Sequence, residues 1–226
     1  MVKEKLLVLG AKGVAKITIE AAEAGGMFSQ IALLDTYADY DSLLSYPIIG
    51  KCDDFEKYRG EFSHAYVCMA DSKLRKEFTE KLVGAGFTIP NIIHPRAYVS
   101  RHATLGMGVV LDANVTIGPD SKIGDGCIFH GGTSISHDNE VGEYCFFAYN
   151  IATNGSVRIG DNTFVGASSC IKNDINIGNN VLVAAGSVVI DDVPDDVMVA
   201  GVPAKVKKEK VEIKYLVWPN TYKAET

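Results

Sequence analysis

The sequence has no Cys-x-x-Cys pair, no long apolar run and no excess of positive charge. Its five cysteines are widely spaced and odd in number, which argues against a disulfide framework or a zinc site and fits a reducing, cytoplasmic compartment. No apolar run approaches the about 20 residues of a membrane span, and the first residues do not resemble a signal peptide. A net charge of −6 gives no support for a nucleic-acid partner.

Glycine is abundant instead, with 22 residues, and the dominant pattern has a period of six. From Ile93 to Val189, sixteen of the seventeen positions spaced six apart are apolar, and Thr153 is the exception. The position after each is usually glycine or alanine. No α-helix repeats every six residues and a strand repeats every two. The period predicts a triangular solenoid, the parallel β-helix, in which three hexapeptides form one coil of about 18 residues.

Residues 1–90 follow another pattern, in which short apolar strands alternate with helical stretches. Strands are expected at 6–9, 31–34 and 65–69, and helices at 14–24 and 73–82. The alternation predicts a small Rossmann-like parallel sheet whose ligand binds at the carboxyl ends of its strands. The expected substrate-binding residues there are Gly10, Lys12, Gly13, Asp35, Asp71 and Ser72. The third glycine of the dinucleotide-binding fingerprint is missing, which disfavours a nicotinamide cofactor. A tight turn that binds no ligand also fits these residues.

The motifs of both parts together resemble those of a known family. They lie at 7–13, 47–50, 71–75, 92–99, 136–138 and 201–205. In order and spacing they are similar to sugar acyltransferases of the sialic acid O-acetyltransferase type, and within them to the nucleotide-linked amino-sugar N-acetyltransferases. The resemblance implies a left-handed β-helix at 91–205, a homotrimer, acetyl-CoA as cosubstrate and no metal. It also implies a nucleotide-linked 4-amino-4,6-dideoxy sugar as acceptor, made for bacterial surface glycans or glycoproteins.

His137 is the candidate general base. It stands two residues after the inward Ile135, in a polar stretch. Asn139 there breaks a small-residue rule of the repeat, by which the fourth residue after an inward position is usually small or β-branched. A neutral imidazole is a suitable acceptor for the proton of an attacking amine, and Asp138 beside it would hold the tautomer. Stacking places Gly155, one coil later, directly above His137, where its N–H would face the thioester carbonyl. A solvent-exposed His-Asp pair and a simple turn glycine are the alternatives, and the resemblance favours catalysis.

The expected acetyl-CoA contacts are Phe146, Gly155, Ala167, Ala185 and Lys205. The two alanines are interpreted as continuing the face of Gly155 and leaving room for the pantetheine arm. Val14 and Phe146 depart from the family, which commonly has histidines at both positions, so the acceptor or the acyl group is open. Residues 206–226 extend past the resemblance, and the alternation at 211–217 is typical of a strand that caps the last coil.

The sequence leaves three other interpretations of the function open. An O-acetyltransferase of a sialic-acid-like sugar would use the same base. A non-catalytic nucleotide-binding trimer would keep the fold alone. A metal enzyme on the same solenoid would need three convergent histidines, and His94 and His130, two coils apart, supply only two. The sequence does not choose among UDP, dTDP and GDP as the nucleotide.

Overall fold

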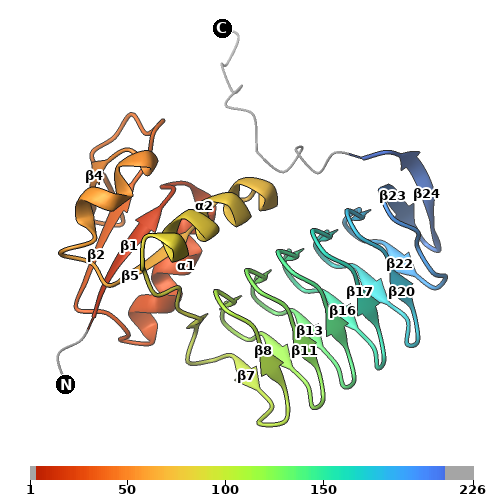
Figure 1. The fold of residues 1–226 in the computed structure, drawn as a ribbon. Helices are drawn as coiled ribbons and strands as arrows, with labels where there is room; N and C mark the ends of the chain where they lie inside the picture. Colours follow the sequence, from red (N-terminus) through yellow and green to blue (C-terminus); the bar gives the residue numbers. More distant parts are fainter. Residues whose placement is uncertain (1–3, 212–226) are drawn as a thin grey trace, which may run out of the picture.

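The computed structural model describes residues 4–211, and its first part is a small α/β domain (Figure 1). The parallel strands are β1 (Lys5–Leu9), β2 (Gln30–Leu34), β4 (Tyr46–Gly50) and β5 (His64–Val67), and β3 (Ser42–Leu43) is an antiparallel edge strand. The sheet order is β3-β4-β2-β1-β5. The helices are α1 (Gly13–Ala24), the 3-10 helix η1 (Cys52–Tyr58) and α2 (Ser72–Gly84). The expected Rossmann-like sheet is confirmed, while β3, β4 and η1 were not predicted.

The second part is a parallel β-helix with three sheets. The domain-facing sheet contains β6 (Ile92–Ile93), β9 (Val110–Leu111), β12 (Ile128–Phe129), β15 (Phe146–Phe147), β18 (Phe164–Val165), β21 (Leu182–Val183), β23 (Val197–Gly201) and β24 (Ala204–Glu209). The second sheet contains β7 (Tyr98–Val99), β10 (Thr116–Ile117), β13 (Ser134–Ile135), β16 (Ala152–Thr153), β19 (Cys170–Ile171) and β22 (Val188–Val189). The third sheet contains β8 (Thr104–Leu105), β11 (Lys122–Ile123), β14 (Glu140–Val141), β17 (Arg158–Ile159) and β20 (Asn176–Ile177).

The six-residue period builds the core of this prism. The second residue of each two-residue strand points inward, and those from Leu111 to Val189 are almost completely buried. Phe129 and Phe147 stack inside it with ring centroids 4.5 Å apart. Equivalent positions of successive coils are 18 residues apart, as in the bond from the Asp161 N–H to Asn179. In the last coil this separation falls to 16, as in the bond from the Asn179 N–H to Asp195.

The solenoid ends in an antiparallel strand pair. β24 runs antiparallel to β23, so it covers the edge that the last parallel strand would expose. The capping strand expected at 211–217 lies, apart from Val211, outside the described residues. The structure therefore places β24 as the terminal strand of the domain-facing sheet.

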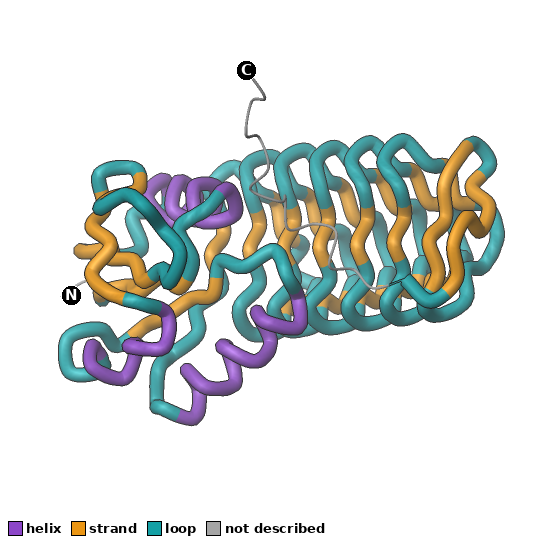
Figure 2. Tube along the Cα trace, turned by 90° about the horizontal axis from the view of Figure 1, so that it is seen from above, coloured by secondary structure: helices purple, strands orange, loops and turns teal. Residues whose placement is uncertain are grey.

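The N-terminal domain sits on the domain-facing sheet (Figure 2). The outward side chains of Ile92, Val110 and Ile128 are fully buried in the core of that domain. The Arg75 guanidinium, 1% exposed, donates to the carbonyls of Gly126 at 3.2 Å and Tyr144 at 2.9 Å on the solenoid. These contacts fix the two parts to each other, with the carboxyl end of β5 over the middle coils.

Candidate active site

His137 lies on the edge of the prism between the second and third sheets, which is opposite the domain-facing sheet. Asp138 has a φ of +57°, a left-handed conformation that aspartate tolerates well. The turn brings the Asp138 carboxylate to 2.6 Å from His137 Nδ1. Both side chains are more than half exposed, at 59% and 56%. The pair therefore presents an oriented imidazole at the surface. Because Nδ1 is bonded to Asp138, Nε2 is the nitrogen available for proton transfer.

Gly155 stands directly against this imidazole, as the stacking predicts. The Ser156 N–H donates to the His137 carbonyl at 3.1 Å, which joins the two turns. A Cβ on Gly155 would lie 2.4 Å from His137 Cε1, a distance that real Cβ atoms do not adopt. The glycine therefore leaves the space that the ring occupies, and any larger residue would displace the imidazole.

Polar side chains support the His137 turn from inside the solenoid. The buried Asn139 amide donates to the carbonyls of His137 and Asn154, and the Ser136 N–H donates to Thr153 Oγ1 at 3.4 Å. Thr153 is the single polar residue of the inward series, and Asn139 breaks the small-residue rule. The sequence analysis noted both exceptions without assigning them a role, and the structure shows that both hydrogen-bond to the backbone of the turn that carries His137.

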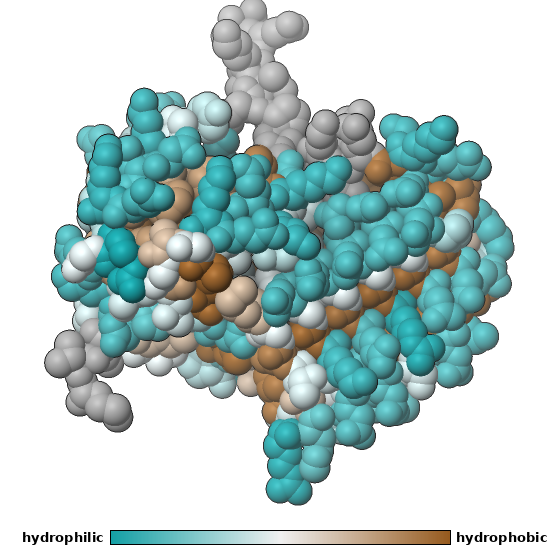
Figure 3. Space-filling view, in the orientation of Figure 1, coloured by the Kyte–Doolittle hydropathy of each residue, from teal (hydrophilic) through white to brown (hydrophobic). Residues whose placement is uncertain are grey.

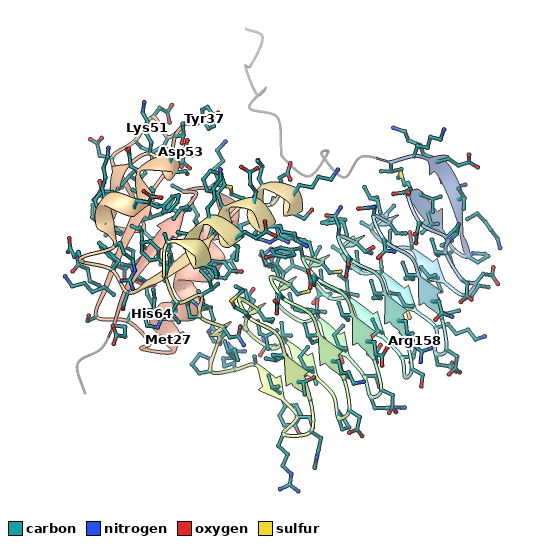
Figure 4. All side chains as sticks on the ribbon, in the orientation of Figure 1. Met27, Tyr37, Lys51, Asp53, His64 and Arg158 are labelled. Carbon is teal, nitrogen blue, oxygen red and sulfur yellow. The ribbon has the colours of Figure 1, made fainter. Side chains whose placement is uncertain are left out.

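The carboxyl edge of the N-terminal sheet holds the glycine turn. Gly10 has a φ of +97°, and a Cβ there would lie 2.8 Å from the Cys68 carbonyl oxygen. The Asp35 carboxylate accepts from the N–H groups of Ala11 and Tyr37, both at 2.7 Å. Tyr37 itself is 83% exposed and lies with Lys51 and Asp53 at one end of the domain (Figure 4). Asp35 thus orders the turn through its own hydrogen bonds.

The start of α1 is open. Lys12 is its N-cap residue, and no side chain caps the helix. A Cβ on Gly13 would meet nothing within 4 Å. The first N–H groups of a helix carry a positive partial charge and bind phosphate well. The structure therefore brings Gly10, Lys12 and Gly13 together at an edge suited to an anionic ligand.

Asp71 and Ser72 have other partners in the structure. The Asp71 carboxylate caps α2 by accepting from the N–H groups of Lys73 at 3.0 Å and Leu74 at 3.1 Å. Ser72 Oγ bonds to Asn162 Oδ1 of the solenoid. Their substrate contacts remain a prediction, and the observed bonds orient α2 and join the domains.

The expected shared face of Gly155, Ala167 and Ala185 is wrong. Ala167 and Ala185 lie on the edge between the domain-facing and second sheets, because 12 residues separate Gly155 from Ala167 and a full coil needs 18. Phe146 packs on the domain-facing sheet against the N-terminal core. Lys205 lies on β24 and pairs with Asp191 at 2.9 Å. Their contacts with acetyl-CoA remain predictions, and no single edge of one chain holds them all.

A surface groove of about 490 Å³ runs over the third sheet, along the edge that this sheet shares with the domain-facing sheet, and His137 lies on the other edge of the third sheet. Its apolar base is formed by Val141, Ile159 and Ile177 with the glycines that follow them. Lys122, Glu140 and Arg158 flank it and form ion pairs at 3.3 Å and 3.4 Å. Figure 3 shows an apolar stripe along this side of the solenoid. Sequence reasoning missed the groove, although the glycine after each inward residue was the signal.

Within residues 4–211, no three histidine, cysteine or acidic side chains converge as a metal site would require. No helix in the same residues is long and apolar enough to cross a membrane. All five cysteines, which lie within that range, are free thiols.

The α/β domain on a hexapeptide solenoid is the fold of an acetyltransferase of the hexapeptide-repeat class, and the His137–Asp138 pair fits this class. The chain belongs to the family of these enzymes that carry a PglD-type N-terminal domain, as the motifs predicted. Residues 5–82 match the PglD N-terminal domain. Residues 102–137 match the bacterial transferase hexapeptide, and residues 156–190 the hexapeptide repeat of succinyl-transferase. Family membership also gives the solenoid its left hand.

Two solved structures are similar over 91% of this chain, each with a TM-score of 0.87. The acetyltransferase domain of PglB from Neisseria gonorrhoeae, in complex with acetyl coenzyme A, is 31% identical and matched over its full length. A histidine-to-asparagine mutant of perosamine N-acetyltransferase from Caulobacter crescentus, in complex with CoA and GDP-perosamine, is 33% identical and matched over 97% of its chain. Among curated proteins, none matches.

Proposed function

We propose that this protein transfers the acetyl group of acetyl-CoA to the amine of a nucleotide-linked 4-amino-4,6-dideoxy sugar, for surface-glycan or glycoprotein synthesis. The observation that carries the proposal is the exposed His137–Asp138 pair at 2.6 Å with Gly155 against the ring. The relative solved with GDP-perosamine binds an acceptor of this class. The open start of α1 suits the acceptor's phosphates, and the free cysteines suit a cytoplasmic enzyme.

His137 acts as general base in a direct transfer. Asp138 accepts the Nδ1–H, so the Nε2 lone pair faces the acceptor amine. The neutral amine attacks the thioester carbonyl and the N–C bond forms while Nε2 takes the amine proton. The C–S bond then breaks, and the imidazolium returns the proton to the sulfur of CoA. The Gly155 N–H faces the oxygen on which negative charge develops.

The complete site needs two copies of the chain. His137 stands on the edge opposite the sheet on which the N-terminal domain sits, so one chain cannot bring its own acceptor to its own base. A homotrimer about an axis parallel to the solenoid joins the His137 edge of one copy to the domain-facing side of the next.

Mixed trimers test this arrangement. His137→Ala removes the base and Gly13→Asp obstructs the acceptor edge, so each variant alone is expected to be nearly inactive. Co-expressed and purified through two different tags, the hybrid trimers should regain a measurable fraction of activity, because some sites combine two intact halves. Hybrids no more active than the parent variants would contradict a shared site, as would a monomeric mass at micromolar concentration.

The acceptor is identified by a thermal-shift screen of UDP, dTDP and GDP followed by transfer assays on the matching sugars. We expect one diphosphate to stabilise the protein and the corresponding 4-amino sugar to gain one acetyl group on nitrogen. Acetylation of a hydroxyl on a sialic-acid-like sugar alone would instead identify an O-acetyltransferase. Nucleotide binding without any transfer would identify a non-catalytic trimer.

A further inference from the structure

A buried arginine lies between the N-terminal sheet and the solenoid. Among the aspartate, glutamate, lysine and arginine side chains of residues 4–211, Arg75 alone is buried, with 1% of its surface exposed. Its guanidinium donates to four main-chain carbonyls, those of Met69 at 2.7 Å, Ala70 at 3.4 Å, Gly126 at 3.2 Å and Tyr144 at 2.9 Å. It therefore joins the carboxyl end of β5 to two turns of the solenoid. The catalytic steps above do not use it.

The positive charge of Arg75 has no counter-ion in the described part of the chain. No ion pair within residues 4–211 involves its guanidinium. Burial raises the pKa of Tyr66, Tyr144 and Cys127, so these neighbours carry no negative charge at neutral pH. Burial also lowers the pKa of Arg75, but arginine stays protonated in proteins. Since carbonyl dipoles carry no net charge, a full positive charge stays inside the protein.

This charge lies close to the glycine turn that begins the proposed acceptor site. A Cβ on Gly10 would lie 2.8 Å from the Cys68 carbonyl oxygen and 3.7 Å from Met69 Cγ. The Met69 carbonyl is also the nearest acceptor of Arg75. One short segment therefore contacts the turn and the guanidinium. Buried charges are screened much less than exposed ones, so the field of Arg75 extends to the turn and to the open start of α1.

We propose that Arg75 is a positioning residue of the acceptor site, whose buried positive charge attracts the diphosphate of the nucleotide without touching it. The first N–H groups of α1 bind the phosphates directly. Arg75 strengthens this binding through its field, and the bound diphosphate supplies the negative charge that the interior lacks. The same four hydrogen bonds hold this edge on the solenoid. The inference rests on the proposed function and adds an electrostatic role for a residue that no ligand can reach.

The test compares the Kd of a nucleoside diphosphate with the Kd of its uncharged nucleoside, because the charge acts on the diphosphate alone. The probes are UDP, dTDP and GDP beside uridine, thymidine and guanosine, measured by calorimetry and, for weak binding, by displacement. Arg75→Gln should weaken diphosphate binding by about 10-fold and leave nucleoside binding unchanged, as expected for a charge in a medium of low effective dielectric constant.

Two further variants separate the charge from the hydrogen bonds. Arg75→Lys keeps a positive charge but loses the planar fork, so it should retain most of the diphosphate affinity. Both Arg75 variants should lower Tm, since each loses bonds to carbonyls, and only Arg75→Gln should lose the preference for the diphosphate. Lys76→Gln is the matched control. It removes a charge from the next position of α2, where the side chain is 51% exposed and pairs with Glu143, and should change neither Kd.

Equal weakening of diphosphate and nucleoside in folded Arg75→Gln would overturn the inference, because a displaced site affects both ligands. Unchanged binding of both would overturn it as well. If Arg75→Gln does not fold, Arg75→Lys decides, and a loss of its diphosphate preference by about 10-fold would contradict a role of the charge. Diphosphate binding by wild type without acetyl transfer to any nucleotide-linked amino sugar would contradict the proposed function alone.

Discussion

The side-chain amide of Asn139 donates a hydrogen bond to the backbone carbonyl of His137 over 2.9 Å. The same nitrogen donates to the carbonyl of Asn154 over 3.0 Å, the residue before Gly155. One buried amide therefore joins the turn that carries the candidate base to the turn that faces it. Its effect on catalysis is positional, because it touches the backbone of His137 and not the reacting atoms.

Asn139→Val should lower kcat by about 10- to 100-fold, since small displacements of a catalytic group cost rates of this order. The fold should tolerate the change, because Val157 occupies the same position one coil later. KM for acetyl-CoA should change little. The matched control is Thr163→Val, which removes a hydrogen bond to the Gly178 carbonyl on another edge and should leave kcat unchanged. Equal losses in the two variants would show that the effect is general destabilisation.

Gly155→Ala should lower kcat by about 100-fold through the position of the imidazole. Its new methyl group would lie 2.4 Å from His137 Cε1, so the ring must move. The check is steady-state kinetics beside Gly84→Ala, whose added Cβ meets nothing within 4 Å. An active Gly155→Ala enzyme with normal kcat would show that the ring does not act from the observed position.

Gly13→Asp should weaken acceptor binding and leave acetyl-CoA binding intact. The added carboxylate would stand among the N–H groups proposed to bind the diphosphate and repel it. An acidic residue in the first turn favours the helix, so α1 itself should not be lost. Gly13→Ala, which fills the same open space without charge, is expected to have a much smaller effect. Calorimetry with each ligand separates the two sites, and equal loss of both ligands in a folded variant would contradict this division.

Acid should destabilise the folded protein partly through His130. Burial lowers the pKa of His130 in the folded chain below the about 6.5 of an unfolded one. As pH falls through that unfolded value, the unfolded chain takes up a proton that the folded chain does not, so stability falls. The drop in Tm between about pH 7 and pH 5 at fixed protein concentration should therefore be smaller for His130→Phe than for wild type. Identical drops would mean that His130 is not kept neutral by the fold.

The periodicity was enough to predict the solenoid, because each hexapeptide must place one apolar side chain inward and one small residue at a corner. It also placed Gly155 on His137, since stacking fixes residues one coil apart. Ala167 was assigned to the wrong edge because its separation from Gly155 is two hexapeptides and not three.

The sequence analysis did not predict the other contacts that position the site. The Asp71 carboxylate caps α2 by a local contact, and its expected contact with substrate stays a prediction. Arg75 holds the N-terminal domain on the solenoid by bonds to backbone carbonyls of residues more than 50 positions away in the chain. Carbonyl acceptors have no sequence signature, so this docking was not predictable.

The most direct test of the account measures acetyl transfer from acetyl-CoA to a nucleotide-linked 4-amino-4,6-dideoxy sugar by wild type and His137→Ala. We predict that wild type forms the N-acetylated sugar and free CoA in equal amounts. His137→Ala should lower kcat by about 10²- to 10⁴-fold, the range for loss of a general base, with little change in KM for acetyl-CoA. A folded His137→Ala protein that retains the wild-type kcat would contradict the assignment of the base.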